Sequence, residues 1–188
     1  MKIDLVYLWV DDTDWEWKRR RNKYIDTFDE YDEDATDECR FYNNDELKYS
    51  LRSVEKNAPW VNKIFIVTDN QIPEWLDTEN EKIKIVNHCD IIPEQYLPIF
   101  NSNAIESRIP FISGLSEYFL YANDDTFFWN PVEKDFFFKD NKPIFRRGKY
   151  LKKSKVCKRL YGTTIQYSYN TLSKNIQFRF LHFSRIII

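Results

Sequence analysis

Four short apolar runs along the chain predict the strands of a sheet. They are rich in β-branched and aromatic residues and alternate little between apolar and polar positions, which is typical of strands covered on both faces. The runs are Ile3–Val10, Lys63–Thr68, Ile83–Val86 and Tyr118–Ala122. Each ends in acidic or amide residues, which indicates a polar turn at the end of each strand.

The segments between these runs show helical signals. One apolar helix face recurs at steps of four, three and four residues: Leu47, Leu51, Val54 and Ala58. Asn44 is the expected N-cap of this helix, and Pro59 is expected to stop it. We expect a turn and a short helix at Pro73–Leu76, and a further helix capped within 101–103. Strands that alternate with helices predict an α/β fold with a mostly parallel sheet and flanking helices.

The amino-acid composition limits the kinds of ligand and partner that we expect. The chain has 188 residues and a formal net charge of -2, which suits one domain with a real core. With only three Gly, no glycine-rich phosphate loop is available, so a phosphate ligand would need a metal or basic side chains. No motif that reads nucleic acid is present, and we expect no nucleic-acid partner. No apolar run is long enough for a membrane span, so at most peripheral membrane contact is expected.

Cysteine usage and charge runs add smaller expectations. Cys39, Cys89 and Cys157 form no zinc spacing and predict reduced thiols in a cytoplasmic protein, at the inner face of the plasma membrane if membranes are contacted. The acidic run 26–38 is expected to be a solvated loop. The basic run 146–159 could bind phosphate groups, or it could be a solvated loop. We divide the chain into a core, 1–145, and a second segment, 146–188.

The tripeptide Asn123-Asp124-Asp125, directly after the fourth run, carries the most specific chemistry. Two hard oxygen donors on one turn suit Mg²⁺ or Mn²⁺ with a diphosphate, and the alternative is that they cap a turn or helix. Because parallel strands bring their carboxyl ends to one edge, six acids are expected along one rim: Asp11, Asp12, Asp69, Asp90, Asp124 and Asp125. Such a rim repels itself without cations, which favours a metal–nucleotide site.

Several short motifs then occur in a recognisable order. They are Ile3 to Asp14, Asn44-Asp45-Glu46-Leu47, Tyr49 to Ser53, Ala58-Pro59-Trp60-Val61, Ile66-Val67-Thr68-Asp69, Phe100 to Glu106, and Gly114 to Glu117 leading to Asp124-Asp125. Together they resemble the first two conserved blocks of the Stealth proteins. Asp12 replaces a Gly of the usual first block. The family includes bacterial capsular polysaccharide phosphotransferases and an animal N-acetylglucosamine-1-phosphotransferase.

The resemblance implies a nucleotide-sugar transferase fold, GT-A-like and Rossmann-related. It also implies transfer of a sugar-1-phosphate from a UDP-sugar to a polysaccharide hydroxyl, with formation of a phosphodiester and release of UMP. One alternative is a metal-dependent glycosyltransferase that releases UDP. Another is an inactive nucleotide-sugar-binding fragment, because the family's later blocks, with a histidine and an arginine thought to act at the phosphate, are incomplete here. We therefore expect a chain truncated at its C-terminus.

Candidate roles follow for individual residues. Asp124 and Asp125 would hold the divalent ion. The donor would be bound by the end of the first strand and two further positions: Asp11, Asp12, Asp14, Asn44 and Asp69. Asp45 and Arg52, two helical turns apart, could meet the donor together, or Arg52 could make an ordinary salt bridge. Asn103 and Glu106 could orient the acceptor hydroxyl, or form a helix cap.

Overall fold

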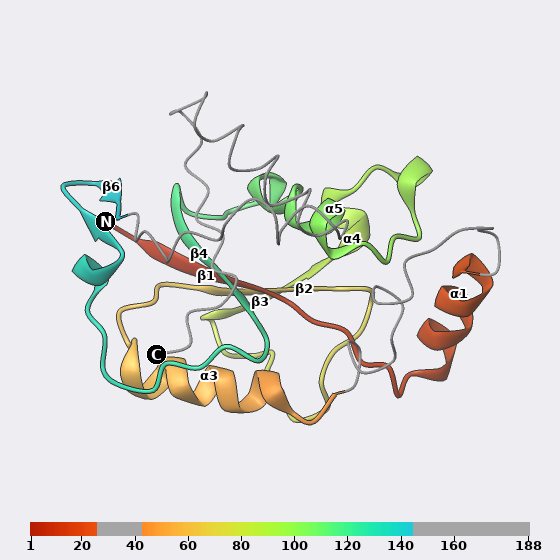
Figure 1. Ribbon diagram of the computed structural model, residues 1–188, viewed down its shortest axis with the longest axis horizontal. Coiled ribbons are helices and arrows are strands. Elements are labelled where there is room, and N and C mark those ends of the chain that lie inside the picture. Colours follow the sequence, from red (N-terminus) through yellow and green to blue (C-terminus); the bar gives the residue numbers. More distant parts are fainter. Residues whose placement is uncertain (26–42, 145–188) are drawn as a thin grey trace, which may run out of the picture. The chain divides into compact units, whose positions relative to one another are not determined.

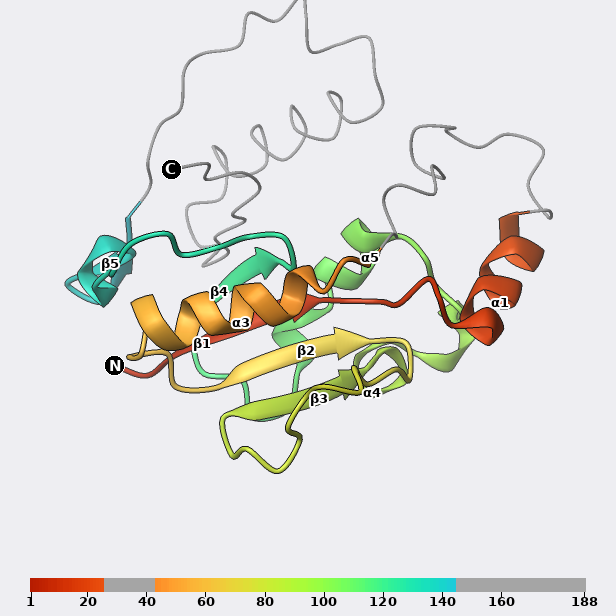
Figure 2. The same ribbon diagram turned by 90° about the horizontal axis from the view of Figure 1, so that it is seen from below.

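A four-stranded parallel sheet forms the centre of the computed structural model, which describes residues 1–25 and 43–144 (Figure 1). Its strands are β1 (Ile3–Leu8), β2 (Ile64–Thr68), β3 (Ile83–Asn87) and β4 (Tyr118–Asn123). Figure 2 shows them side by side in the order β3-β2-β1-β4. The four predicted strands and the α/β class are therefore confirmed.

Burial follows strand position in this sheet. In β1 and β2 nearly every side chain is buried, as their continuous apolar sequences predict for central strands. β3 lies at the edge, and most of its side chains are partly exposed. In register, Tyr7 of β1 lies between Ile66 of β2 and Ala122 of β4.

Helices cover both faces of the sheet (Figure 1). Helix α3 (Glu46–Asn57) lies on one face and buries Leu47, Ser50, Val54 and Asn57, one side of the helix. The opposite face carries α4 (His88–Ile91), α5 (Ser102–Glu106), and the short 3-10 helices η2 (Glu94–Tyr96) and η3 (Ile109–Phe111). Helix α1 (Trp15–Ile25) lies beyond the carboxyl end of β1.

The connections reverse the strand order between β1 and β4. The term β1–β4 crevice is used here only for this position, outside the carboxyl ends of the two strands. The chain passes from β1 to β2 and β3 on one side, and then crosses β1 to place β4 on its other side. In doubly wound sheets, ligands bind outside the carboxyl ends of the strands at such a reversal of strand order. Asp11 and Asp12 follow β1 and Asp124 and Asp125 follow β4, so these pairs border the crevice.

Several local expectations were wrong. Helix α1 was missed, because its sequence is mostly polar and basic. The residue before α3 is Asp45, not Asn44, and with φ at 62° it makes no side-chain cap hydrogen bond. At 73–76 there is a turn without a helix, closed by Leu76 N donating to Pro73 O at 3.0 Å. By contrast, the helix cap expected within 101–103 is confirmed: Asn101 caps α5 and accepts from Ala104 N, while Asn103 lies within the helix.

The described chain falls into two compact units. Met1–Lys134 belongs to the first, and Asp135 begins the second. The described part of the second contains η4 (Lys134–Phe136) at its border and a hairpin of β5 (Phe138–Lys139) and β6 (Lys142–Pro143). Asp140 and Asn141 both have positive φ, the backbone that a two-residue hairpin turn requires.

Some expectations fall outside the described residues. These are the acidic run 26–38, the basic run 146–159, the predicted boundary at 145/146, Cys39 and Cys157. Cys89 is an exposed free thiol. Within residues 1–25 and 43–144, no helix has both the length and the apolar character needed to span a bilayer.

Candidate functional site

The two carboxylates after β4 lie on a tight turn. Thr126 N donates to Asn123 O at 3.0 Å, which closes a four-residue turn with Asp124 and Asp125 at its centre. Asp125 N donates to Asp124 Oδ1 at 3.1 Å. The turn thus fixes two adjacent acids at the carboxyl end of β4.

A third acid, Glu46, approaches this turn from the start of α3. Burial raises the pKa of Asp124 to about 6, and the negative charges of Asp125 and Glu46 add to the rise. Burial also raises the pKa of Glu46, but two hydrogen bonds from Asn44 outweigh this and hold that pKa below its usual value. Asn44 N donates to Glu46 Oε2 at 2.6 Å and Asn44 Nδ2 to Oε1 at 3.0 Å. Glu46 therefore stays charged and disfavours ionisation of Asp124.

Polar side chains of α3 hold the chain that follows the turn. Ser50 Oγ donates to Thr126 O at 2.5 Å, and Phe128 N donates to Ser53 Oγ at 2.9 Å. Asn57 Nδ2 donates to Phe128 O. These contacts occur at successive turns of one helix, so α3 positions the Asp124-Asp125 turn as well as Glu46.

Two phenols flank the acidic turn from β1 and β4. Tyr7 OH is 2.7 Å from Ser50 Oγ, and burial raises the pKa of Tyr7. Tyr121 OH donates to Glu106 Oε1 at 3.0 Å, and burial followed by the Glu106 charge raises its pKa too. Both phenols are neutral at physiological pH and can donate hydrogen bonds.

The loop from β1 to α1 is held by Gln71, a residue that the sequence analysis did not single out. Gln71 Oε1 accepts from Asp11 N at 2.8 Å, while Nε2 donates to Asp11 O at 2.9 Å and to Asp14 Oδ2 at 3.0 Å. Asp14 Oδ1 accepts from Glu16 N at 2.9 Å, and thereby caps α1. The Gln71 hydrogen bond is the main cause that lowers the pKa of Asp14.

The ends of β2 and β3 hold the remaining predicted rim acids. Asp69 Oδ2 pairs with Arg20 of α1 at 2.9 Å, and Asp69 Oδ1 lies 4.0 Å from His88 Nδ1. Burial lowers the pKa of His88 against the opposing effect of Asp69. Asp90 Oδ2 accepts from Asn87 N at 2.7 Å in the capping box of α4. Three buried side-chain atoms here lack a hydrogen-bond partner: Asp12 Oδ1, Thr68 Oγ1 and His88 Nδ1.

The other predicted residues are spread over the same region. Asp45 forms a 3.7 Å ion pair with Lys48. Arg52 is exposed on α3, with its guanidinium carbon 5.7 Å from the ring centre of Tyr49. Asn103 is exposed and lies one helical turn before Glu106 on α5. Asn44 and Asp14 both have hydrogen-bond partners within the protein.

Sequence reasoning missed four side chains of this region: Tyr7, Glu46, Gln71 and Tyr121. Glu46 was named only as part of the motif Asn44-Asp45-Glu46-Leu47, and the two tyrosines only within predicted strands. The signal for Gln71 was absent, because its partners lie about 60 positions earlier in the chain.

The acidic turn fits a metal only in part. In the described residues, no three His, Cys, Asp or Glu side chains are grouped to hold an ion by themselves. The adjacent Asp124 and Asp125 and the raised pKa of Asp124 do fit a cation that binds through two carboxylates. Mg²⁺ commonly binds proteins in this way, with water and substrate phosphates as its other ligands.

Comparison with known proteins identifies the family blocks. Residues 1–29 match the model of Stealth protein CR1, conserved region 1, and residues 40–145 match that of Stealth protein CR2, conserved region 2. The second match alone covers more than half of the chain and contains Glu46, Gln71 and the Asp124-Asp125 turn.

Individual relatives agree. A capsular polysaccharide phosphotransferase of Haemophilus influenzae is 49% identical over 74% of this chain and 38% of its own length. An exopolysaccharide phosphotransferase of Streptomyces coelicolor is 51% identical over 74% of this chain and 15% of its own length. A receptor polysaccharide phosphotransferase of Streptococcus oralis is 40% identical over 94% of this chain and 56% of its own length.

The chain thus spans between about one seventh and just over half of these relatives. It carries Stealth conserved regions 1 and 2, in this order, and their strands form one parallel sheet. The chain belongs to the Stealth protein family.

Proposed function

We propose that this chain binds the nucleotide-sugar donor of a sugar-1-phosphate transferase that builds capsular or other surface polysaccharide. In the proposed reaction, an acceptor hydroxyl oxygen attacks the phosphorus next to the sugar of a UDP-sugar. A phosphodiester forms, the bond between this phosphorus and the bridging oxygen of the diphosphate breaks, and UMP leaves with that oxygen. The observation that carries the proposal is the cluster of Glu46, Asp124 and Asp125 at the β1–β4 crevice, where burial and like charge raise the pKa of Asp124 to about 6.

A divalent cation would relieve this repulsion. Asp124 and Asp125 would hold Mg²⁺ or Mn²⁺, and the cation would supply charge neutralisation for the diphosphate. Two protein carboxylates leave room for donor phosphate oxygens among the ligands. This need for a bound diphosphate fits the names of the relatives, which are polysaccharide phosphotransferases.

The chain's own residues would position the substrates. The β1–α1 loop, held by Gln71, presents Asp11 and Asp12 for the ribose hydroxyls of the donor. The neutral phenol of Tyr121 donates to Glu106, so the Glu106 carboxylate is oriented beside the crevice. There Glu106 would accept a hydrogen bond from the attacking hydroxyl and hold its oxygen toward the phosphorus.

Calorimetric titration with a panel of UDP-sugars, with and without Mg²⁺, tests the donor site. Asp124→Asn and Asp125→Asn should each weaken Mg²⁺-dependent binding by about 1–3 kcal/mol, because each removes one carboxylate–metal bond. Glu55→Gln is the matched control, since Glu55 is an exposed acid of α3. Unchanged affinity in both Asp variants would contradict the site.

Product analysis tests the reaction. Incubation with a UDP-sugar, Mg²⁺ and a polysaccharide acceptor should release UMP. Release of UDP would instead identify a glycosyltransferase, in which the acceptor attacks the sugar carbon. Metal-dependent binding of the donor without turnover would identify a binding fragment of the longer transferase.

A further inference from the structure

One face of α1 carries positive charge that the described residues do not neutralise. Two basic residues of this helix are used internally: Arg20 pairs with Asp69 at 2.9 Å, and Arg21 is only 5% exposed. By contrast, among residues 1–25 and 43–144 the side chains of Lys18, Arg19 and Lys23 have no ion-pair or hydrogen-bond partner. Unpaired cations on one helix face are suited to bind an external anion.

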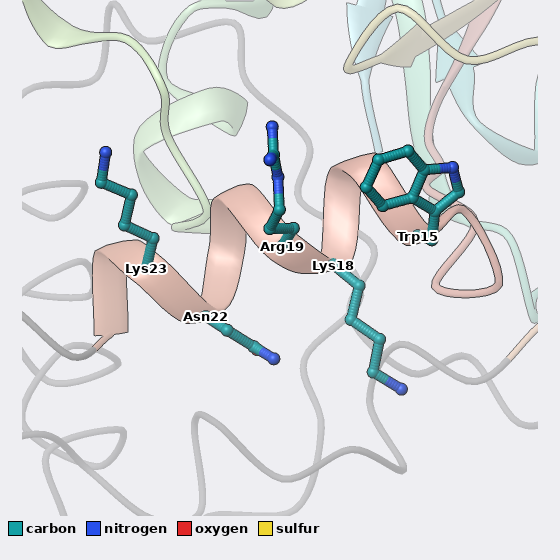
Figure 3. Close-up of a pocket in the computed structure, with 5 residues that line it drawn as sticks. All are labelled: Trp15, Lys18, Arg19, Asn22 and Lys23. Atoms are coloured by element: carbon teal, nitrogen blue, oxygen red, sulfur yellow. The ribbon is translucent and has the colours of Figure 1, made fainter.

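An exposed aromatic ring and an amide accompany these charges. Trp15, Lys18, Arg19, Asn22 and Lys23 line an open cavity of about 530 Å³. Figure 3 shows Arg19 and Lys23 extending to one side of the helix and Lys18 and Asn22 to the other. Trp15 is 66% exposed, and the guanidinium carbon of Arg19 lies 5.5 Å from its ring centre. Such a ring can stack on a sugar while the cations bind phosphate.

We propose that this α1 basic face (Trp15, Lys18, Arg19, Asn22 and Lys23) binds the phosphodiester groups of the growing polysaccharide acceptor. This inference rests on the proposed function. Each transfer joins the donor phosphorus to an acceptor oxygen, expels UMP and releases the hydroxyl proton, so the product gains one singly charged phosphodiester. After repeated transfers the acceptor carries one negative charge per repeat, and it complements the three cations.

The position of α1 suits an acceptor that reaches the crevice. Its N-cap, Asp14, belongs to the loop that follows β1, and Arg20 ties the helix to Asp69 at the end of β2. The α1 basic face is therefore fixed near the edge where the strands end. A lipid surface fits less well, because Trp17 of this helix is buried against Phe100, at 5.7 Å between ring centres, and the exposed rings of Trp15 and Tyr24 lie among cations.

Binding measurements on the full 188-residue chain test the proposal. The probes are oligosaccharides from a phosphodiester-linked capsular polysaccharide, the same sugars after chemical removal of phosphate, and vesicles containing one third anionic phospholipid. The triple variant Lys18→Gln, Arg19→Gln, Lys23→Gln should bind the phosphodiester probe roughly tenfold more weakly than the unaltered chain, with a smaller salt dependence. Trp15→Ala should weaken binding of both sugar probes.

The control variant carries the same charge change elsewhere: Lys2→Gln, Lys56→Gln, Lys84→Gln, all at exposed positions. It should bind the phosphodiester probe like the unaltered chain. Equal affinity of the two triple variants would overturn the proposal, and so would a loss of vesicle binding in the α1 variant with glycan binding unchanged. UDP-sugar affinity should be unaltered in all variants. If the unaltered chain bound no UDP-sugar, the proposed donor site would be wrong. The glycan measurement would still decide whether the α1 basic face binds phosphodiesters.

Discussion

Two acidic strand ends at the same edge of the sheet have opposite electrostatic character. After β1, hydrogen bonds from Gln71 and from the first turn of α1 lower the pKa of Asp14. After β4, burial together with Asp125 and Glu46 raises the pKa of Asp124 to about 6. The first carboxylate is stabilised by donors within the protein, whereas the second is surrounded by other acids.

This difference separates structural acids from acids that need a ligand. Asp14 caps a helix and binds Gln71, so its charge is already compensated. Asp124 faces two like charges, so its ionised form is less favourable in the folded chain than in water, and a bound cation would offset this cost. Perturbed acids of the second kind cluster at functional sites. The acids at the strand ends therefore indicate which edge of the sheet carries the candidate site. The partners of each acid indicate where along that edge the site lies.

The largest effect should come from Asp124→Asn in the absence of metal. The folded-state pKa of Asp124 is raised above its unfolded value, so its ionisation destabilises the fold as pH rises from about 4 to about 6. A shift of this size corresponds to at most about 3 kcal/mol. Urea unfolding should show the variant as more stable than the unaltered chain at pH 8, and similar to it at pH 4.

The comparison has two controls. Glu55→Gln removes an exposed acid from α3 and should leave the stability profile nearly unchanged. Saturating Mg²⁺ with a UDP-sugar should shrink the difference, because the cation binds more tightly to the chain that keeps Asp124 and stabilises it more. A variant that is less stable than the unaltered chain at every pH would show that Asp124 is a structural acid like Asp14.

A smaller effect is expected at the β1–α1 loop from Gln71→Leu. The substitution replaces a buried polar side chain by an apolar one of similar size, so it removes the hydrogen bonds to Asp11 and Asp14 and leaves the Asp11 backbone without this partner. Stability should fall by about 2 kcal/mol. The pKa of Asp14 should rise toward its usual value, as read by NMR titration. A stability loss with no change in the Asp14 titration would show that Gln71 acts on the backbone alone.

The sheet could be predicted well because its information is local. Continuous apolar runs mark β1, β2, β3 and β4, and alternation with helices makes them parallel, so the acidic strand ends had to meet at one edge. The apolar spacing from Leu47 to Ala58 likewise identified α3. These features depend on neighbours within one element.

The site could be predicted only in part because its partners are distant in sequence. Glu46 reaches Asp124 across more than seventy positions, and Gln71 reaches Asp11 across 60. No periodicity records such contacts. Helix α1 was missed for a related reason: its stability comes from Trp17 on Phe100, Arg20 on Asp69 and the Asp14 cap, and its own sequence is mostly polar.

The smallest effect should come from Arg20→Gln, which tests an acid intermediate between the two cases. Asp69 has one cation, Arg20 at 2.9 Å, and one neutral neighbour, His88 at 4.0 Å. The Arg20 side chain is 38% exposed, so loss of the pair should cost only about 0.5 kcal/mol.

The pKa of His88 should respond to Arg20→Gln more clearly than the free energy of unfolding does. Burial keeps the pKa of His88 low, and the Asp69 charge opposes that effect. Arg20→Gln removes the positive charge that shares the Asp69 carboxylate with His88. Because this favours protonation of the imidazole, the pKa of His88 should rise. Arg19→Gln, one position away without an acidic partner, should leave it unchanged. If Arg20→Gln also left the pKa of His88 unchanged, solvent and not Arg20 would compensate the charge of Asp69. Asp69 would then resemble Asp124, whose charge has no cationic partner among the described residues.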